Sequence, residues 1–238
     1  MAQEHKYIKT ILCLANSRKM SGRCLAGKEI DGEKIGAWIR PVSAREHEEI
    51  SENDRRYEDG HTANLLDIVS IPMLEPKPGT YQSENHLIAD QFYWTKSGSA
   101  TWAQIEKAVD SVGGPLWVNG YSSAYAMNDQ VPEAEAAKLK SSLLLIKPSE
   151  LKICVALRGN PHFPQKRSVR AHFLLNKHSY DIGLTDALME RKYLQGENGT
   201  FPVPNALLCV SLGEPFKGYA YKLAAALITP DRVGKSDE

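Results

Sequence analysis

Short apolar, β-prone segments separated by turn residues dominate this chain. Within the first 40 residues, such segments cover residues 7–15, 23–27 and 36–42, and Asp31 and Gly32 form a turn signal before the third. Three short strands joined by turns predict an antiparallel meander, which is how a small β-barrel begins. Because strands and helices do not alternate regularly along the sequence, the pattern favours barrels over a parallel α/β sheet.

The rest of the chain has the same character. Further strands are predicted at residues 65–73, 91–96, 143–147, 151–156, 168–176, 178–182, 206–212 and 219–228, with a hairpin turn at Asn176 and Lys177. Short helices are predicted at residues 99–109, with Ser99 or Thr101 as the N-cap, at 132–137 and at 186–193. Residues 44–64 are charged and nearly without core residues, so we expect an exposed loop with short helical turns. The predicted fold class is therefore mostly β with a few short helices, a β-rich α+β fold.

The length of 238 residues allows two small domains. A polar stretch rich in Ser and Ala separates two strand-rich halves, neither of which visibly repeats the other's sequence. We therefore expect a barrel with a helical insertion at residues 1–125, a linker at 126–141, a second barrel at 142–230 and a flexible tail at 231–238.

The composition is that of an ordinary globular protein, with 42% hydrophobic and 24% charged residues. These values exclude disordered, collagen-like and disulfide-scaffold chains. No apolar run approaches the roughly 20 residues that span a bilayer, and the first residues lack the apolar stretch of a signal peptide. The four cysteines form no CxxC pair, so we expect no metal site. Together these observations predict a cytoplasmic protein without a membrane partner.

The net charge is zero, but the charges are unevenly distributed. Residues 1–40 carry +4, residues 41–140 carry −8 and residues 141–200 carry +4. Such asymmetry is typical of polyanion-binding faces separated by a solvated spacer, although chance fluctuation explains it equally well. A protein that coats DNA indiscriminately is disfavoured, because such proteins normally carry a basic domain.

Three groups of segments form a recognisable pattern. Residues 13–19, 22–27 and 38–43 form the first, Tyr180 and Asp181 with residues 184–186 form the second, and residues 208–216 with 221–223 form the third. Together they resemble the bacterial dual OB-containing domain family over about residues 6–228. The resemblance implies two small OB-like antiparallel barrels packed in one chain, in agreement with the strand pattern. It implies no catalytic residues.

The polar segment after the first strand is the first candidate binding site. If the first two strands pair, one end of the barrel carries Asn16, Ser17, Arg18, Lys19 and Arg23, with Arg40 at the end of a strand nearby. The cations suit phosphates, and the amide and hydroxyl suit phosphate, sugar or base edges. The structural alternative is a capped hairpin with solvated cations, because Asn and Ser are common turn residues.

A loop in the second half is the second candidate. Residues 158–167 carry Arg158, Lys166 and Arg167 together with His162 and Phe163, and Arg170 follows. Bases and an aromatic ring in one loop suit a nucleic-acid or phosphate contact. A plain surface loop is the alternative interpretation.

Aromatic side chains are the second requirement for binding single strands, because bases stack on them. The candidates in the first half are Trp38, Tyr57, Phe92, Tyr93 and Trp94. Trp38 lies in an apolar strand and is expected in the core. Neighbours in a strand point to opposite faces, so residues 92–94 are expected to expose a ring on one face.

Catalytic interpretations are weaker. His172 and His178 lie across a predicted hairpin with Asp181 and Asp186 downstream, which suits a general acid/base pair or a metal site. Two histidines satisfied within a sheet are the favoured alternative. His47, which lies among glutamates, fits a solvated charged face better than a site. The sequence has no GxSxG, HExxH or Walker-type motif, so we expect no catalytic residues and no cofactor.

The sequence thus favours a non-catalytic protein whose OB-like barrels bind nucleic acid, single-stranded more than duplex, through base-rich loops and exposed aromatic rings. Two alternatives stay open. One is a protein–protein adaptor in a multi-component bacterial system, which an exposed apolar patch would favour. The other is a sensor or enzyme for a nucleotide-like small molecule, which a closed pocket holding Asn16, Arg23 and Arg40 would favour.

Overall fold

A computed structural model describes residues 5–159 and 165–235, and the chain divides into two compact units. Unit 1 comprises Met1–Val109, Lys140–Ser142 and Pro230–Glu238, and unit 2 comprises Asp110–Leu139 and Leu143–Thr229. Residues 126–139, which we expected in a linker, thus belong to unit 2. The assignment of the two barrels to residues 1–125 and 142–230 stays a prediction.

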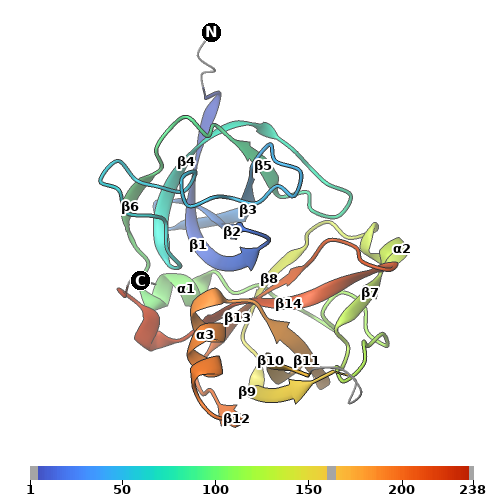
Figure 1. Ribbon diagram of the computed structural model, residues 1–238. Coiled ribbons are helices and arrows are strands. Elements are labelled where there is room, and N and C mark those ends of the chain that lie inside the picture. Colours follow the sequence, from blue (N-terminus) through green and yellow to red (C-terminus); the bar gives the residue numbers. More distant parts are fainter. Residues whose placement is uncertain (1–4, 160–164, 236–238) are drawn as a thin grey trace. The chain divides into compact units, whose positions relative to one another are not determined.

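Unit 1 is a closed β-barrel (Figure 1). Its strands are β1 (Tyr7–Lys19), β2 (Gly22–Asp31), β3 (Lys34–Val42), β4 (Asp67–Pro76), β5 (Asn85–Ile88) and β6 (Thr95–Ser99). β1, β2 and β3 form the predicted antiparallel meander. β3 then pairs in parallel with β5, β5 pairs with β4, and β4 returns to β1. This five-stranded path is the OB arrangement that the family resemblance implied, and β6 extends it beside β4.

Unit 2 repeats the path with other sequences. Its strands are β7 (Gln130–Pro132), β8 (Leu143–Ile146), β9 (Ser149–Arg158), β10 (Lys166–Leu175), β11 (His178–Leu184), β12 (Gly199–Pro202), β13 (Leu207–Leu212) and β14 (Tyr219–Ile228). β9, β10 and β11 form a meander, β11 pairs in parallel with β14, β14 pairs with β13, and β13 pairs with β8. Because β8 leads almost directly into β9, the chain closes this second barrel. β12 adds to the outer edge of β9.

One segment of unit 2 fills a gap between two barrel strands. β11 and β14 pair at only two positions, Gly183 with Leu223 and Leu184 with Ala224. Beyond them the strands separate, and residues 127–132 lie between, with Met127 bridging to Asp181 and β7 pairing with β14. The segment completes hydrogen bonds that the two strands would otherwise lack.

Each unit has its own hydrophobic core. In unit 1 the core includes Ile11, Leu25 and Ile39 from the three meander strands. In unit 2 it includes Val169, Ala171, Phe173 and Leu175 from β10, Tyr180 and Ile182 from β11, and Leu227 from β14. Alternate residues of β10 are buried, so the residues between them lie on the outer face of the barrel.

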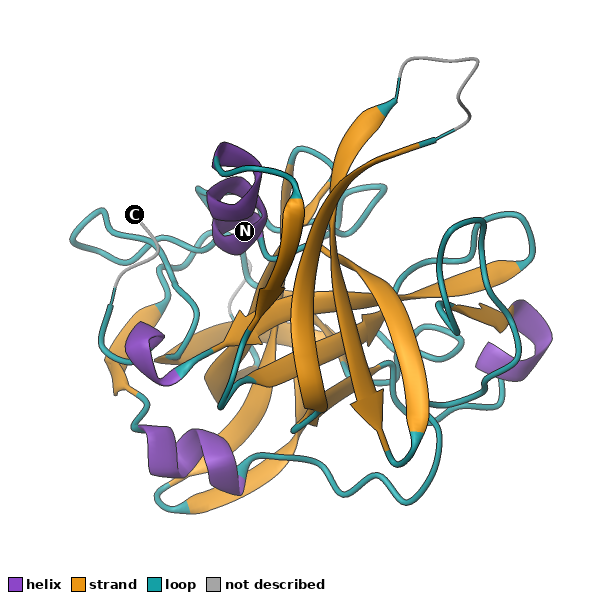
Figure 2. Cartoon of the chain, turned by 90° about the horizontal axis from the view of Figure 1, so that it is seen from below, coloured by secondary structure: helices purple, strands orange, loops and turns teal. Residues whose placement is uncertain are grey.

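The helices are short, as Figure 2 shows. They are α1 (Trp102–Lys107), α2 (Glu133–Ala136), α3 (Ala187–Gln195) and the 3₁₀ helix η1 (Pro230–Arg232). Thr101 and Gln104 form a capping box at α1, and Asp186 caps α3 by accepting from the Met189 amide at 3.1 Å. The predicted hairpin turn is confirmed, because Asn176 and Lys177 both have positive φ, as a two-residue turn between antiparallel strands requires.

A glycine allows β1 and β2 to come unusually close. An added Cβ at Gly27 would lie 2.1 Å from the carbonyl oxygen of Leu12, where the register shifts between Cys13 and Ala15. No side chain fits in that space, so glycine is required at this bulge.

Several expectations are corrected. Residues 16–19 belong to β1 rather than to a loop, because their backbones continue the ladder to β2. Residues 44–64 include a turn at residues 51–55, as expected, but they are not free of core residues, since Ile50, Tyr57 and Ala63 are buried. Residues 91–94 are irregular, and the strand begins only at Thr95. The short strands β5, β7 and β12 were not predicted. The expected tail begins as η1, in which Arg232 is 7% exposed.

Candidate functional site

The first predicted site is a hairpin end and only partly accessible. Asn16 and Ser17 are 8% and 6% exposed and pair with Leu25 and Cys24 in β2. Arg18 is exposed and Lys19 half-buried beside the Met20 turn. The capped hairpin that we gave as the alternative therefore describes Asn16 and Ser17, and only the cations reach the surface.

Arg23 and Arg40 are held by carboxylates. The Arg23 Nε lies 3.3 Å from a Glu52 oxygen. Arg40 is 4% exposed, lies 3.3 Å from Glu84 Oε1 and donates to Ser142 Oγ at 2.8 Å. A buried arginine paired in this way supports the fold of unit 1 and does not reach a ligand.

The predicted loop of the second half also supplies internal partners. Arg167 donates to the carbonyl oxygens of Leu194 and Gly196, each at 2.7 Å, and to Asn198 Oδ1 at 2.9 Å. It therefore caps the C-terminal end of α3. Lys166 is exposed at the start of β10. His162 and Phe163 lie outside the described residues.

Arg158 and Arg170 converge on one carboxylate, and with His172 and Asp181 they form what we call the Asp181 cluster. Arg170 Nε lies 2.5 Å from Asp181 Oδ1, and Arg158 Nη2 and His172 Nε2 lie 3.3 Å and 3.0 Å from Oδ2. Burial by itself raises the pKa of Asp181, but the contacts with His172 and Arg170 hold it below its usual value. Arg170 also lies 3.6 Å from Asp129. These two arginines are therefore largely neutralised within unit 2.

The Asp181 cluster lies on the outer face of β10 and β11, the second and third strands of the barrel path. OB folds bind ligands on this face and on the loops that flank it. The equivalent face of unit 1 is covered, because Trp38 is 9% and Lys28 7% exposed, and Lys28 Nζ donates to the carbonyl of Ala108 at 2.7 Å. Trp38 is thus buried, as expected.

Apolar side chains are exposed beside the cluster. Of nine large exposed hydrophobic residues in the described part of the chain, five come from three neighbouring segments of unit 2. We call these five the rim: Tyr121, Tyr125, Met127, Leu157 and Phe216. Tyr125 and Phe216 are 63% and 61% exposed. The rim was missed from the sequence because these residues lie in separate segments.

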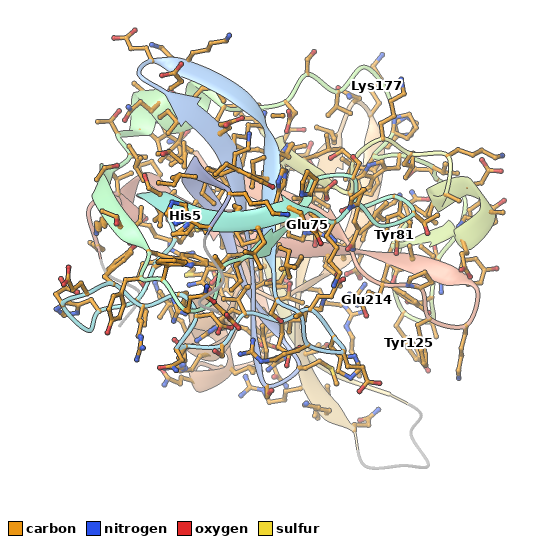
Figure 3. All side chains as sticks on the ribbon, turned by 90° about the horizontal axis from the view of Figure 1, so that it is seen from above. His5, Glu75, Tyr81, Tyr125, Lys177 and Glu214 are labelled. Carbon is orange, nitrogen blue, oxygen red and sulfur yellow. The ribbon has the colours of Figure 1, made fainter. Side chains whose placement is uncertain are left out.

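Direct contacts join the three segments of the rim. Arg158, next to Leu157, donates to the carbonyl oxygen of Tyr125. The ring centroids of Tyr121 and Tyr219 are 6.2 Å apart, and Tyr219 bridges to Phe216. The rim therefore runs from the end of β9, across residues 121–127, to the β13–β14 turn (Figure 1). Tyr125 is labelled in Figure 3.

Two cations accompany the rim. The Nζ of Lys217 lies 5.2 Å from the centre of the Phe216 ring, and Lys166 is exposed at the start of β10, opposite Arg158 in the ladder. A cation over an aromatic face is attracted by the ring quadrupole. The rim is therefore aromatic and weakly basic.

Unit 1 has a separate hollow of about 670 Å³, lined in part by Tyr57, Asn64, Asp67, Tyr93 and Lys96. Asp67 is 3% exposed, and its Oδ2 accepts from the Tyr57 hydroxyl at 2.9 Å. Lys96 Nζ lies 2.6 Å from Asp67 Oδ1. Burial raises the pKa of Tyr57 far above its usual value, which keeps the hydroxyl a donor. The Asp67 carboxylate is therefore satisfied by protein groups, and Glu58, Asp59 and His61 are further polar residues that line the hollow.

The other aromatic candidates are distributed between core and surface. Trp94 is 1% and Tyr93 47% exposed, so one of the two neighbouring rings faces solvent as expected. The guanidinium of Arg56 lies 4.9 Å from the Tyr93 ring centre. Phe92 is half-buried, with its ring 4.9 Å from that of His5.

The acid/base candidates separate into two groups. His172 and Asp181 meet in the Asp181 cluster. His178 is exposed, and Asp186 caps α3 and also accepts from the Leu227 amide at 3.1 Å. Within residues 5–159 and 165–235, no three His, Cys, Asp or Glu side chains are placed to hold a metal ion. No helix in the same residues is both long and apolar enough to cross a bilayer.

Comparison with known proteins gives one family. Residues 9–227 match the family described as the dual OB-containing domain. No curated protein matches the chain. Among solved structures, the crystal structure of the tetrameric p202 HIN2 is similar over 94% of each chain, at 7% identity and a TM-score of 0.30. A likeness this distant adds nothing to the assignment of fold or function.

Proposed function

The chain belongs to the dual OB-containing domain family, and from that premise we propose that it binds single-stranded nucleic acid through the rim of unit 2. The observation that carries the proposal is the grouping of exposed rings at the OB ligand face. Tyr121, Tyr125 and Phe216 are at least 40% exposed and come from segments that contact one another. OB folds present such surfaces to oligonucleotides and oligosaccharides.

Stacking supplies most of the affinity in this proposal. Each base stacked on an aromatic side chain contributes about 1–3 kcal/mol, with little dependence on sequence. The rim offers three exposed rings for this purpose. In a duplex the base faces are already stacked on one another and are not available to protein rings, so single strands are favoured over duplexes.

Phosphate neutralisation contributes less to the binding affinity than the sequence suggested. Arg158 and Arg170 already face Asp181, and Arg167 caps α3, so the cations left beside the rim are Lys166 and Lys217. Each phosphate contact on a single strand adds about 0.7 to the slope of log affinity against log salt. Two contacts therefore predict a shallow slope, with a magnitude of about 1.4.

The test is fluorescence anisotropy with labelled single-stranded and duplex oligonucleotides at several salt concentrations. We expect single-strand binding with the shallow slope, and a loss of at least about tenfold in affinity in the double variant Tyr125→Ala, Phe216→Ala. Tyr93→Ala removes an exposed ring from unit 1 and is the matched control, which should bind like the wild type. Absence of binding at low salt, or equal affinity in all three proteins, overturns the proposal.

A protein partner is the second candidate. Met127 and Leu157 are 48% and 53% exposed, and aliphatic side chains on a surface fit a protein interface better than a nucleic acid. In that case Met127→Ser and Leu157→Ser would abolish complex formation while Tyr125→Ala left it largely intact. The small-molecule alternative loses its expected pocket, because Asn16 and Arg40 are buried and neither lines the hollow of unit 1.

A further inference from the structure

Three neighbouring strands place a thiol next to the imidazole and the carboxylate of the Asp181 cluster. Cys154 on β9 lies directly between Arg170 on β10 and Thr200 on β12 in the ladder. His172 on β10 lies opposite Asp181 on β11. All lie on the outer face, because their sequence neighbours Ile153, Val155, Ala171 and Ile182 are in the core.

Two short distances connect the thiol, the imidazole and the carboxylate. Cys154 Sγ lies 3.9 Å from His172 Nδ1, and His172 Nε2 lies 3.0 Å from Asp181 Oδ2. The Thr200 hydroxyl lies 3.0 Å from the same sulfur. A carboxylate at Nε2 favours the tautomer with its proton on that nitrogen, which leaves the Nδ1 lone pair facing the thiol. The carboxylate also stabilises the imidazolium that forms when the thiol loses its proton.

The carboxylate is itself fixed in place. Arg170 Nε holds Asp181 Oδ1 at 2.5 Å, and Arg158 approaches Oδ2 at 3.3 Å. Asp181 is buried, while the side chain of His172 is 37% exposed and Cys154 is half-buried. The thiol therefore has a positioned base, a neighbouring hydroxyl and access from solvent, the features that distinguish reactive cysteines from structural ones.

From this geometry we infer that Cys154 is a nucleophilic thiol and a modification site for small disulfides. His172 Nδ1 takes the thiol proton, and the thiolate attacks one sulfur of the disulfide. The sulfur–sulfur bond of the reagent breaks as a new one forms to Cys154, and the departing thiolate takes the proton from His172. Cys154 is oxidised and half of the reagent is reduced to a thiol. His172 is the base and Asp181 a positioning residue.

Unit 2 offers no accessible second thiol to reverse the step. Cys13 and Cys209 are 1% and 0% exposed, and none of the four cysteines is in a disulfide. Cys209 belongs to the same unit but lies in the ladder between β8 and β14. The mixed disulfide therefore persists until a thiol from outside unit 2 removes it. This inference is independent of nucleic-acid binding.

The experiment compares two half-buried cysteines in the full chain. Cys24→Ser leaves Cys154 as the accessible thiol, and Cys154→Ser leaves Cys24, while the buried pair serves as an internal control. Each protein is mixed with the chromogenic disulfide dithiobis(nitrobenzoic acid) and, separately, with glutathione disulfide, and the adduct is located by mass spectrometry. Because a positioned base assists the removal of the thiol proton, we expect Cys154 to react about tenfold faster than Cys24 at pH 7.

The pH profile distinguishes a base from a merely structural side chain. His172→Gln should slow Cys154 to about the rate of Cys24 at pH 7, and the difference should vanish at pH 10, where thiols ionise unaided. Equal rates for Cys154 and Cys24, or an equal loss in His172→Gln at every pH, overturn the inference. If circular dichroism shows that His172→Gln is unfolded, Thr200→Val replaces it, with a smaller slowing expected at pH 7 only.

Discussion

At the scale of single residues, unit 2 buries a lysine amine that holds the segment leading into the rim. Lys222 on β14 is fully buried, and its Nζ donates to the carbonyl of Val118 at 2.7 Å and to Asn119 Oδ1 at 2.9 Å. The Tyr180 hydroxyl accepts from the Leu116 amide at 2.8 Å. These bonds fix residues 116–119 against the barrel, immediately before Tyr121.

Burial lowers the pKa of Lys222 to about 7, against the opposing charge of Asp129. A neutral amine still has the two N–H donors that these bonds require. An unfolded lysine has a pKa of about 10.4, so between about pH 7 and pH 10 the unfolded chain binds more protons and the folded state gains stability as pH rises. We expect the free energy of unfolding of the wild type, relative to Lys222→Met, to increase by on the order of 2 kcal/mol from pH 7 to pH 9. Urea unfolding at both pH values measures this difference, and a constant difference would show that the amine is charged when buried.

Contacts between distant residues also explain why several of the predicted binding cations have partners within the protein. The local sequence does not show which partner a basic side chain will have in the fold. Arg158 meets Asp181 and Arg40 meets Glu84 only because separate strands bring them together. Lys166 and Arg18 remained exposed as expected. Local sequence therefore indicated where cations are, whereas which of them are neutralised depends on contacts distant in the chain.

At the scale of elements, the spacing of apolar residues and the turn residues were sufficient to predict most strands and turns of the fold. The long strands, the Asn176 and Lys177 turn and the N-cap of α1, expected at Ser99 or Thr101, are local features and were predicted. The strands β5, β7 and β12 have at most four residues, which is too short for a recognisable period, and they form because a neighbouring strand offers an open edge. Residues 16–19 are polar but pair with β2, so tertiary pairing overrides their turn propensity.

The N-cap residues of α1 and α3 differ in whether they also form hydrogen bonds outside their own helix. Asp186 accepts from Met189 in α3 and from Leu227 in β14, each at 3.1 Å, and is 3% exposed. Thr101 is exposed and serves α1 alone. We therefore expect Asp186→Ala to lower the free energy of unfolding by about 2–4 kcal/mol, the loss of a cap plus an unsatisfied buried amide. The control Thr101→Ala should lower it by about 1 kcal/mol. Thermal unfolding ranks the two, and equal effects would mean that the Leu227 contact adds no stability.

At the scale of the whole molecule, the chain passes between its units more than once. It leaves unit 1 after Val109, returns for Lys140–Ser142, and returns again at Pro230. The sequence favoured a single domain boundary, because a polar stretch resembles a linker even when its residues pack within a domain. The OB architecture was nevertheless foreseen, since it follows from strand count and family resemblance. The rim was not foreseen, because it joins three segments that only the second barrel brings together.

Each unit has a core of its own, so we expect the units to lose structure separately. Glu84→Gln tests this, because it leaves the charge of Arg40 buried without its carboxylate, at a cost of about 3–5 kcal/mol. The control is Glu75→Gln, whose carboxylate forms an exposed pair with Lys6 at 4.0 Å and should cost less than about 1 kcal/mol.

Amide hydrogen exchange followed by mass spectrometry gives the readout for both variants. In Glu84→Gln we expect the amides of β1, β2 and β3 to exchange faster, while those of β10, β11 and β14 keep the protection they have in the wild type. Glu75→Gln should leave both sets unchanged. Equal loss of protection in the two sets would mean that unit 1 and unit 2 unfold as a single cooperative body, and substitutions in unit 1 would then weaken the rim through stability alone.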